Sequence, residues 1–245
     1  MKGGTRNAEC GVPNLRLLAL DLNHKGFAVI PQFASPSTVE ELKEAVAGVS
    51  GGHASAGIRN LVRLCQPVAD FVSSRLVIDQ LATFTGVPPF AVRGILFDKT
   101  PDANWLVAWH QDLTIAVRER RDVTSFGPWS VKEGIPHVQP PAELLACMVT
   151  LRLHLDDCDA RNGALRVLPG SHCHGKLSRS EIAEWRIQTP EHVCEARAGD
   201  ALVMRPLLLH ASSPAEPPHR RRVIHIEFAS HDLPEGLEWF ERVGA

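Results

Sequence analysis

The fold is decided by the stretch at residues 149–168, which reads VTLRLHLDDCDARNGALRVL. Apolar and polar residues alternate from Leu151 to Asp156, and this is the period of a β-strand with one buried face. Asn162-Gly163 follows as a strong hairpin-turn signal, because both residue types accept positive φ angles. A second apolar run, residues 164–168, comes after the turn. The stretch therefore predicts two strands joined by a tight turn.

The same pattern of short apolar runs separated by turn residues continues over the second part of the chain. The predicted strands are residues 90–97, 106–112, 144–156, 164–168, 192–196, 201–204, 207–210 and 223–229. Eight short strands with turn residues between them favour a β-sandwich or a β-barrel.

The first part of the chain mixes one strand with helices. Residues 27–30 form an apolar, strand-like run. Ser35-Pro36 predicts the start of a helix that runs to about residue 49, because Ser is a good N-cap and Pro suits the first helical turn. A stripe of apolar residues predicts a second helix over residues 67–84, which Gly86 ends.

Length and composition set the class of protein. The chain has 245 residues, of which 44% are hydrophobic and 22% charged. These values are typical of a globular protein, and we expect one domain over residues 1–245. Within it we expect helical and strand support at about residues 25–88 and a β core at about residues 89–230. The formal net charge of −2 argues against a nucleic-acid partner, since nucleic-acid binders usually carry a basic excess.

Hydropathy and the spacing of the cysteines indicate the cellular compartment. No apolar run is long enough to predict a membrane span. The first residues carry no apolar core of a secretory signal, and none of the six cysteines has C-x-x-C spacing. We therefore expect reduced thiols in the cytoplasm and no membrane partner.

Residues 113–143 differ in character from the rest of the β region. They contain a charge run at residues 118–122 and three prolines near their end. A long irregular insertion in a compact domain is usually a functional lid or a mobile loop. We predict an irregular lid that helps to shape the substrate pocket. A solvated face is the favoured interpretation of the charge run, and the alternative hypothesis is that Arg118, Arg120 and Arg121 contact an anionic group of the substrate.

The chain has 12 histidines, which directs attention to metal and acid–base sites. Two H-x-D tripeptides occur, His110-Gln111-Asp112 and His154-Leu155-Asp156. On a strand, residues i and i+2 point to the same face, so either tripeptide could offer two ligands to one metal ion. His210, after the apolar residues 207–209, is the natural third ligand. Two histidines and one carboxylate form the facial triad of non-haem iron oxygenases.

Several further motifs surround these residues in a fixed order. Trp109-His110-Gln111-Asp112 comes first, then the Asn162-Gly163 turn with Pro169-Gly170-Ser171-His172, then Gly199-Asp200, and last His210-Ala211-Ser212 with an arginine about ten residues later. Together they resemble the phytanoyl-CoA dioxygenase family of Fe(II)/2-oxoglutarate-dependent oxygenases, over roughly residues 25–230. The resemblance implies a mainly β fold with flanking helices, built on a double-stranded β-helix (a cupin-like jelly-roll).

The resemblance also assigns roles to residues. It implies that His110, Asp112 and His210 bind iron and that His154-Leu155-Asp156 does not. An arginine would pair with the far carboxylate of 2-oxoglutarate. Family spacing favours Arg221, and Arg222 is the alternative, because strand alternation turns only one of these neighbours inward. Ser212 would bind the same carboxylate. Lys99 is a further candidate for a cosubstrate contact, against the alternative of an exposed lysine at a strand end.

The implied reaction uses Fe(II), 2-oxoglutarate and O2 and releases succinate and CO2. Hydroxylation of an unactivated C–H bond of a small molecule is the expected outcome, and the presence of Asp112 favours it over halogenation. Desaturation, cyclisation and epimerisation use the same triad and stay open. Two alternatives of another class are a cupin-like metal isomerase or lyase and a non-catalytic jelly-roll binding module. Neither needs an arginine for a carboxylate, so Arg221 argues against both. The sequence leaves the oligomeric state open.

Overall fold

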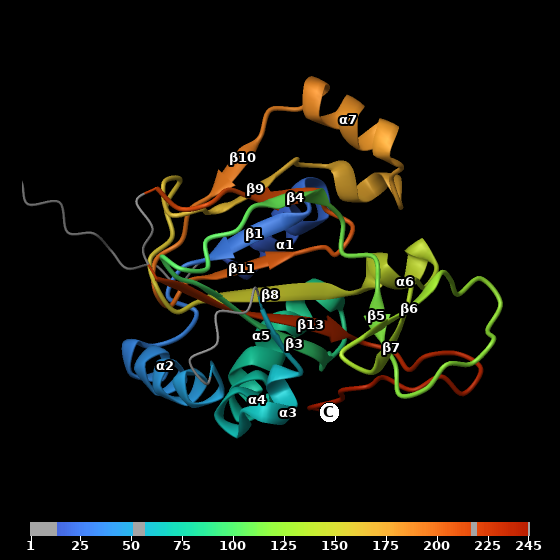
Figure 1. Cartoon of the computed structure of the whole chain (residues 1–245), viewed down its shortest axis with the longest axis horizontal. Helices are drawn as coiled ribbons and strands as arrows, with labels where there is room; N and C mark the ends of the chain where they lie inside the picture. The colour runs from blue at the N-terminus through green and yellow to red at the C-terminus, as the bar shows by residue number, and fades with distance from the viewer. Residues whose placement is uncertain (1–13, 51–56, 217–219, 245) are drawn as a thin grey trace, which may run out of the picture.

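The computed structural model describes residues 14–50, 57–216 and 220–244 (Figure 1). Its core is two antiparallel sheets. The six-stranded sheet has the order β1-β11-β8-β13-β3-β2, and the four-stranded sheet has the order β10-β9-β12-β4. Their bounds are β1 (Phe27–Ile30), β2 (Ile58–Arg59), β3 (Phe90–Lys99), β4 (Val107–His110), β8 (Val149–His154), β9 (Leu165–Val167), β10 (His192–Cys194), β11 (Ala201–Met204), β12 (His210–Ser212) and β13 (Arg221–Ala229). The mainly β class with flanking helices is as predicted.

Strand β8 lies in the middle of the six-stranded sheet, and all six of its residues are buried. The prediction of a half-buried strand is therefore wrong. Leu151 and Leu153 pack into the core beneath the helices, whereas Arg152 lines a cavity between the two sheets. The alternation is real, but its polar face is turned to the protein interior instead of solvent.

Helices cover the outer face of the six-stranded sheet. They are α1 (Leu15–Lys25), α2 (Pro36–Ser50), α3 (Leu61–Leu64), α4 (Gln66–Ser73) and α5 (Arg75–Thr85), and each contributes to one core cluster with β3, β8, β11 and β13. Helix α2 starts as predicted, because Ser35 Oγ accepts a hydrogen bond from Thr38 N at 3.1 Å. The predicted helix over residues 67–84 is broken at Ser74, whose extended backbone and side chain cap α5. The sequence patterns did not predict helices α1 and α3.

Two predicted strands are wrong in part. Residues 144–156 begin with helix α6 (Ala142–Cys147), and only the later residues form β8. Residues 207–210 are not a strand that ends at His210, because β12 begins there. Leu208 N donates instead to Arg205 O at 3.0 Å, so the segment after Met204 is a turn. Leu145, Met148 and residues 207–209 are apolar because they are buried, and burial by itself does not specify strand pairing.

The prediction that residues 113–143 are irregular is wrong. They form a three-stranded sheet of the order β5-β7-β6, made of β5 (Ile115–Ala116), β6 (Trp129–Lys132) and β7 (Ile135–Val138). Glu133 and Gly134, at the turn of the β6–β7 hairpin, both have positive φ, as a two-residue hairpin turn requires. This small sheet stands beside the β core near α6 (Figure 1). Its apolar side joins a core cluster with Leu145 and Trp239.

The remaining elements are the 3₁₀ helix η1 (Ser171–His174) and helix α7 (Arg179–Gln188). No helix among the described residues is long and apolar enough to cross a membrane. The five cysteines of the described ranges are free, and Cys10 lies outside those ranges.

Candidate active site

The two histidines of the predicted triad are brought together by strand register. Strands β4 and β12 pair in the four-stranded sheet with His110 directly opposite His210, and the two ring centroids are 4.2 Å apart. Cross-strand partners on one face of a sheet are near neighbours, so the backbone ladder itself sets this distance.

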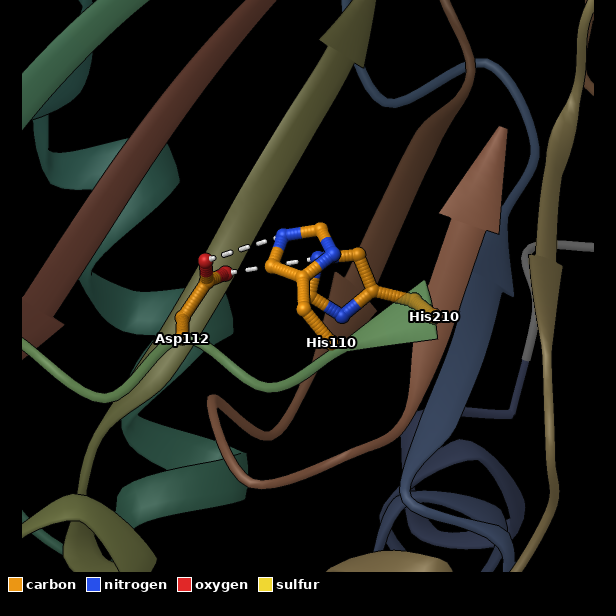
Figure 2. Close-up of side chains that lie close together, drawn as sticks. All are labelled: His110, Asp112 and His210. Atoms are coloured by element: carbon orange, nitrogen blue, oxygen red, sulfur yellow. Dashed lines mark ion pairs between the residues drawn. The ribbon is translucent and has the colours of Figure 1, made fainter. Parts of the chain in front are cut away.

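Asp112 completes the cluster just after β4 (Figure 2). Its backbone N–H donates to Pro206 O at 2.9 Å, which ties the residue to the segment before His210. The carboxylate lies 3.8 Å from His110 Nε2 and 3.7 Å from His210 Nε2. One ligand atom from each of the three residues lies within 4.8 Å of the others, and no other such group of His, Cys, Asp or Glu is found in residues 14–50, 57–216 and 220–244.

Hydrogen bonds fix the tautomer of both histidines. His110 Nδ1 donates to Ala108 O at 2.8 Å, and His210 Nδ1 donates to Leu208 O at 2.9 Å. Nε2 of each ring is therefore left with its lone pair, and metal-binding histidines are typically oriented by such contacts. Burial lowers the pKa of His210 to about 3, so this ring is neutral at physiological pH, as a metal ligand must be.

The Asp112 carboxylate behaves as an ionised ligand would. Burial alone would raise its pKa, but the neighbouring His210, His225, His110 and Arg93 together hold the pKa below its usual range. One of its oxygens, Oδ2, is buried and has no hydrogen-bond partner among the described residues. A buried carboxylate oxygen without a partner is costly unless a cation reaches it, so these residues fit a divalent metal ion.

Gln111, between His110 and Asp112, holds the chain at the metal cluster in place through hydrogen bonds. The sequence patterns assigned it no role. Its Nε2 donates to Leu207 O and to Gly175 O, both at 2.7 Å, and its Oε1 accepts from Leu177 N at 2.8 Å. It therefore links β4 to the segment that leads into His210.

The Pro169-Gly170-Ser171-His172 motif supports the distal histidine from the other side. Gly170 has a φ of +85° and lets the chain turn into η1. Ser171 is fully buried, donates to Leu168 O at 2.8 Å and accepts from Leu209 N at 2.9 Å. The motif thus holds the backbone next to His210 in place.

A cavity of about 150 Å³ lies between the two sheets and contains the triad. An apolar cavity of this volume in another protein admits a benzene-sized molecule, so a compact ligand fits here. Its lining comes from β3, β4, β8, β9, β12, β13 and nearby loops: Arg93, Ile95, Phe97, Lys99, Trp105, Val107, His110, Asp112, Arg152, Leu165, His210, Ser212, Arg221, His225 and Glu227. A larger surface groove near Asp157 and Arg161 contains none of the triad.

Strand alternation separates Arg221 from Arg222. Arg221 is buried and lines the cavity, whereas Arg222 forms a two-pronged ion pair with Asp156, with N–O distances of 2.7 and 2.9 Å. Arg221 Nη1 donates to Gly163 O, and its Nε has no partner among the described residues. Of these two neighbours, Arg221 is therefore the one available to an anion in the cavity. Asp156 is occupied by Arg222, and His154-Leu155-Asp156 forms no metal cluster with the described residues.

Gly163, in the predicted Asn162-Gly163 turn, lies close to two cations of the cavity, Lys99 and Arg221. It has a φ of +69°, and a Cβ atom at this position would lie 2.5 Å from Ser213 O and 3.5 Å from Lys99 Nζ. A side chain would clash at this point, so the turn residue also allows a close approach of two segments.

Lys99 and Ser212 lie together beside Arg221. Lys99 is almost fully buried, and its Nζ donates to Ser212 Oγ at 3.3 Å and to Ser213 O at 2.8 Å. The alternative of an exposed lysine is wrong. Burial, reinforced by the charge of Arg221, lowers the pKa of Lys99 to about 8. The three groups form a site that fits the far carboxylate of a 2-oxo dicarboxylate.

The arginines of the 113–143 segment lie elsewhere. Arg118 pairs with Glu238 and Arg121 with Glu119, and both are exposed. Arg120 lies over the Trp129 ring at 5.5 Å. None of the three lines the cavity, so the hypothesis of a contact with an anionic group gains no support. Residues 118–122 are all exposed, which agrees with the favoured interpretation of a solvated face.

The fold and the site together define a double-stranded β-helix protein with a two-histidine, one-carboxylate triad. The chain belongs to the phytanoyl-CoA dioxygenase (PhyH) family, which matches residues 22–223. This confirms the family predicted from the motifs. The mouse (Mus musculus) peroxisomal phytanoyl-CoA dioxygenase is 27% identical over 173 residues, which are 64% of this chain and 44% of the mouse protein. The chain thus spans less than half the length of that relative.

Solved structures confirm the predicted fold. AviO1 from Streptomyces viridochromogenes Tue57 is 23% identical, with a TM-score of 0.68 over 90% of this chain and 97% of its own. The epimerase SnoN, in complex with Fe3+, alpha ketoglutarate and nogalamycin RO, is 15% identical, with a TM-score of 0.67 over 94% of each chain. At these identities the similarity concerns the fold.

Proposed function

We propose that the protein is an Fe(II)/2-oxoglutarate-dependent dioxygenase acting on a small molecule, and that residues 1–245 work as one catalytic domain. The observation that carries this is the meeting, in one cavity, of the His110–Asp112–His210 cluster with Arg221, a buried arginine whose Nε has no partner among the described residues. Membership of the PhyH family supports it, as does the alpha ketoglutarate bound to the structurally similar SnoN.

Each residue has a defined part. His110, Asp112 and His210 would hold Fe(II) on one face and leave three positions for other ligands. Arg221, Ser212 and Lys99 would hold the far carboxylate of 2-oxoglutarate and so orient its 2-oxo acid end toward the metal. Iron, 2-oxoglutarate and O2 supply the oxidising chemistry, with release of succinate and CO2. The protein positions the reactants and keeps water out.

Hydroxylation of an unactivated C–H bond is the outcome we propose, because Asp112 occupies the position that a halogenase would leave to chloride. Cyclisation, desaturation and epimerisation use the same triad, and SnoN is an epimerase on this fold. We also propose a cytoplasmic location, which the free thiols of the described cysteines support, and no nucleic-acid partner.

Two other classes of protein would need fewer of the residues that line the cavity. A cupin-like metal isomerase or lyase needs the triad but no arginine for a second carboxylate. A binding module needs neither. Burying the guanidinium of Arg221 without an anion is costly, so its position inside the cavity supports a ligand that carries a carboxylate.

The test is an anaerobic titration of the metal-free protein with Fe(II) and then with 2-oxoglutarate. We expect a weak visible charge-transfer band when 2-oxoglutarate is added, because the ligand chelates the iron. The variant Asp112→Ala should neither bind Fe(II) tightly nor show the band. The matched control is His174→Ala, which removes an exposed histidine that lies against the Trp185 ring, away from the cavity.

Metal binding without the band would favour the cupin-like isomerase or lyase. Absence of metal binding in the wild-type protein would contradict the proposal and favour a binding module.

A further inference from the structure

Arg152 is a buried cation with no anionic partner among the described residues. It lies on β8, only 6% of its surface is exposed, and its side chain lines the cavity of the triad. Its Nη1 donates to His225 Nδ1 at 2.8 Å, and its Nε is buried without a partner. A buried charge is normally paired, so this guanidinium calls for an anion.

The surroundings of Arg152 keep it in place. Its guanidinium lies 5.3 Å from the centre of the Phe97 ring. His225 accepts at Nδ1, so it carries its proton on Nε2, which lies 3.7 Å from Glu227 Oε1. Glu227 in turn accepts from Arg93 Nη1 at 2.9 Å. The arginine is thus the end of an ordered polar chain along one wall of the cavity.

A comparison of charges shows which cations of the cavity lack a counterpart. Arg93 is paired with Glu227, and Asp112 is the carboxylate of the metal cluster. Three cations are left without a carboxylate among the residues that the structure describes: Lys99, Arg152 and Arg221. Arg221 and Lys99 have hydrogen bonds to the main-chain oxygens of Gly163 and Ser213. Within the described ranges, Arg152 has only its bond to His225.

The position of Arg152 relates it to both ends of the site. Burial, then the charge of Arg221, lowers its pKa to about 10, and the charge of Asp112 raises it. At neutral pH the group stays charged. Arg152, Arg221 and Asp112 line the same cavity, and the charges of the other two act on Arg152, so a ligand held between Arg221 and the metal cluster comes within its electrostatic range.

We propose that Arg152 is a second cosubstrate-binding arginine, which contacts the 2-oxoglutarate dianion from β8 while Arg221 holds the far carboxylate. This inference rests on the proposed function. It makes the cavity specific for a dianion, since two guanidinium groups would face two carboxylates. His225 acts as a positioning residue, because it holds the Arg152 guanidinium through Nδ1.

The test compares Arg152→Met and Arg152→Lys with Arg222→Met, all loaded anaerobically with Fe(II). Arg222 is a matched control, since it is an arginine on the outer side of β13 and is neutralised by Asp156. The probe is 2-oxoglutarate, and its Kd is read from the visible band. For Arg152→Met we expect Kd to rise about ten- to a hundredfold, the range of a lost charge-assisted hydrogen bond. Arg152→Lys should recover part of this affinity, and Arg222→Met should keep the wild-type Kd.

A second readout separates ligand binding from folding. Fe(II) affinity and the thermal midpoint without 2-oxoglutarate should change little in Arg152→Met, whereas the rise in midpoint on adding 2-oxoglutarate should shrink. A Kd within about twofold of wild type, with the iron site intact, would overturn the inference. If the wild-type protein itself gave no band, the proposed function would fail instead, whatever Arg152 does.

Discussion

The four-stranded and six-stranded sheets face each other across the cavity and bring different chemistry to it. The four-stranded sheet supplies His110 and His210, with Asp112 directly after β4. The six-stranded sheet supplies Lys99, Arg152 and Arg221. The three metal-ligand candidates lie on one wall, which we call the metal wall. The cations that could receive an anionic cosubstrate lie on the other, the cation wall.

The two walls also differ in how their side chains are fixed. The histidines are held by strand register and by hydrogen bonds from Nδ1 to main-chain carbonyls. Arg152 and Arg221 are long side chains, each with an Nε that has no partner in the described residues. The metal wall likewise keeps Asp112 Oδ2 buried without a partner in the described residues, so each wall leaves atoms for its own ligand, a metal ion on one side and an anion on the other. Substitutions on the two walls should therefore have separable effects.

The largest effect is expected on the cation wall from Arg221→Met. The variant should bind Fe(II) normally, and its Kd for 2-oxoglutarate should rise by about a hundredfold, because a two-pronged charged contact is lost. Arg222→Met removes the next residue and should leave this Kd unchanged. Isothermal titration of both metal-loaded variants checks the pair. An equal loss of 2-oxoglutarate affinity in the two variants would contradict the assignment of Arg221 as the arginine that faces the cosubstrate.

The next effect is expected on the metal wall from Gln111→Leu. This variant removes the three hydrogen bonds that tie β4 to the segments at Leu207 and at residues 175–177. We expect Fe(II) affinity to fall about 10- to 100-fold, as for other residues that orient metal ligands. Competition with a metal-binding dye measures it. Unchanged iron affinity would mean that register alone holds the triad.

The smallest effect is a pH dependence that belongs to the cation wall. Burial lowers the pKa of Lys99 to about 8, so its positive charge is lost as pH rises through that value. The carboxylates of 2-oxoglutarate stay ionised over the same range. The affinity for 2-oxoglutarate should therefore be constant below pH 8 and decrease by up to about tenfold per pH unit above it.

The variant Lys99→Met should have weaker affinity at pH 7 and a flatter profile between about pH 7 and 9, because the titrating amine is gone. Fe(II) affinity measured alongside provides the control, and the same slope in both proteins would assign the titration to another group.

Part of the fold could be predicted from the sequence, because some helix ends and strands depend on residues that are neighbours along the chain. The start of α2 follows from Ser35-Pro36, and the end of α5 follows from Gly86, whose φ is +80°. Strands β1 and β11 match their predicted ranges residue for residue. The split at Ser74 and helix α6 were missed, because apolar residues at these positions fit a continuous helix and a continuous strand equally well.

The sequence predicted those residues of the candidate site that belong to short motifs. His110-Gln111-Asp112, His210 and the arginine spacing pointed to the residues that the structure brings together. Family spacing favoured Arg221 over Arg222, and only the tertiary structure shows that Arg221 lines the cavity while Arg222 pairs with Asp156.

The sequence by itself determined the family and the β class and predicted the residues of the triad, because these depend on residue type and spacing along the chain. The tertiary structure alone decided the surroundings of Arg152, Gln111 and Lys99. Arg152 fitted the solvent side of an alternating strand, and for Lys99 a cosubstrate contact and an exposed strand end were both open, but the structure buries both side chains. Whether a polar side chain faces water or a cavity depends on what packs against its strand, and that partner lies far away in the sequence.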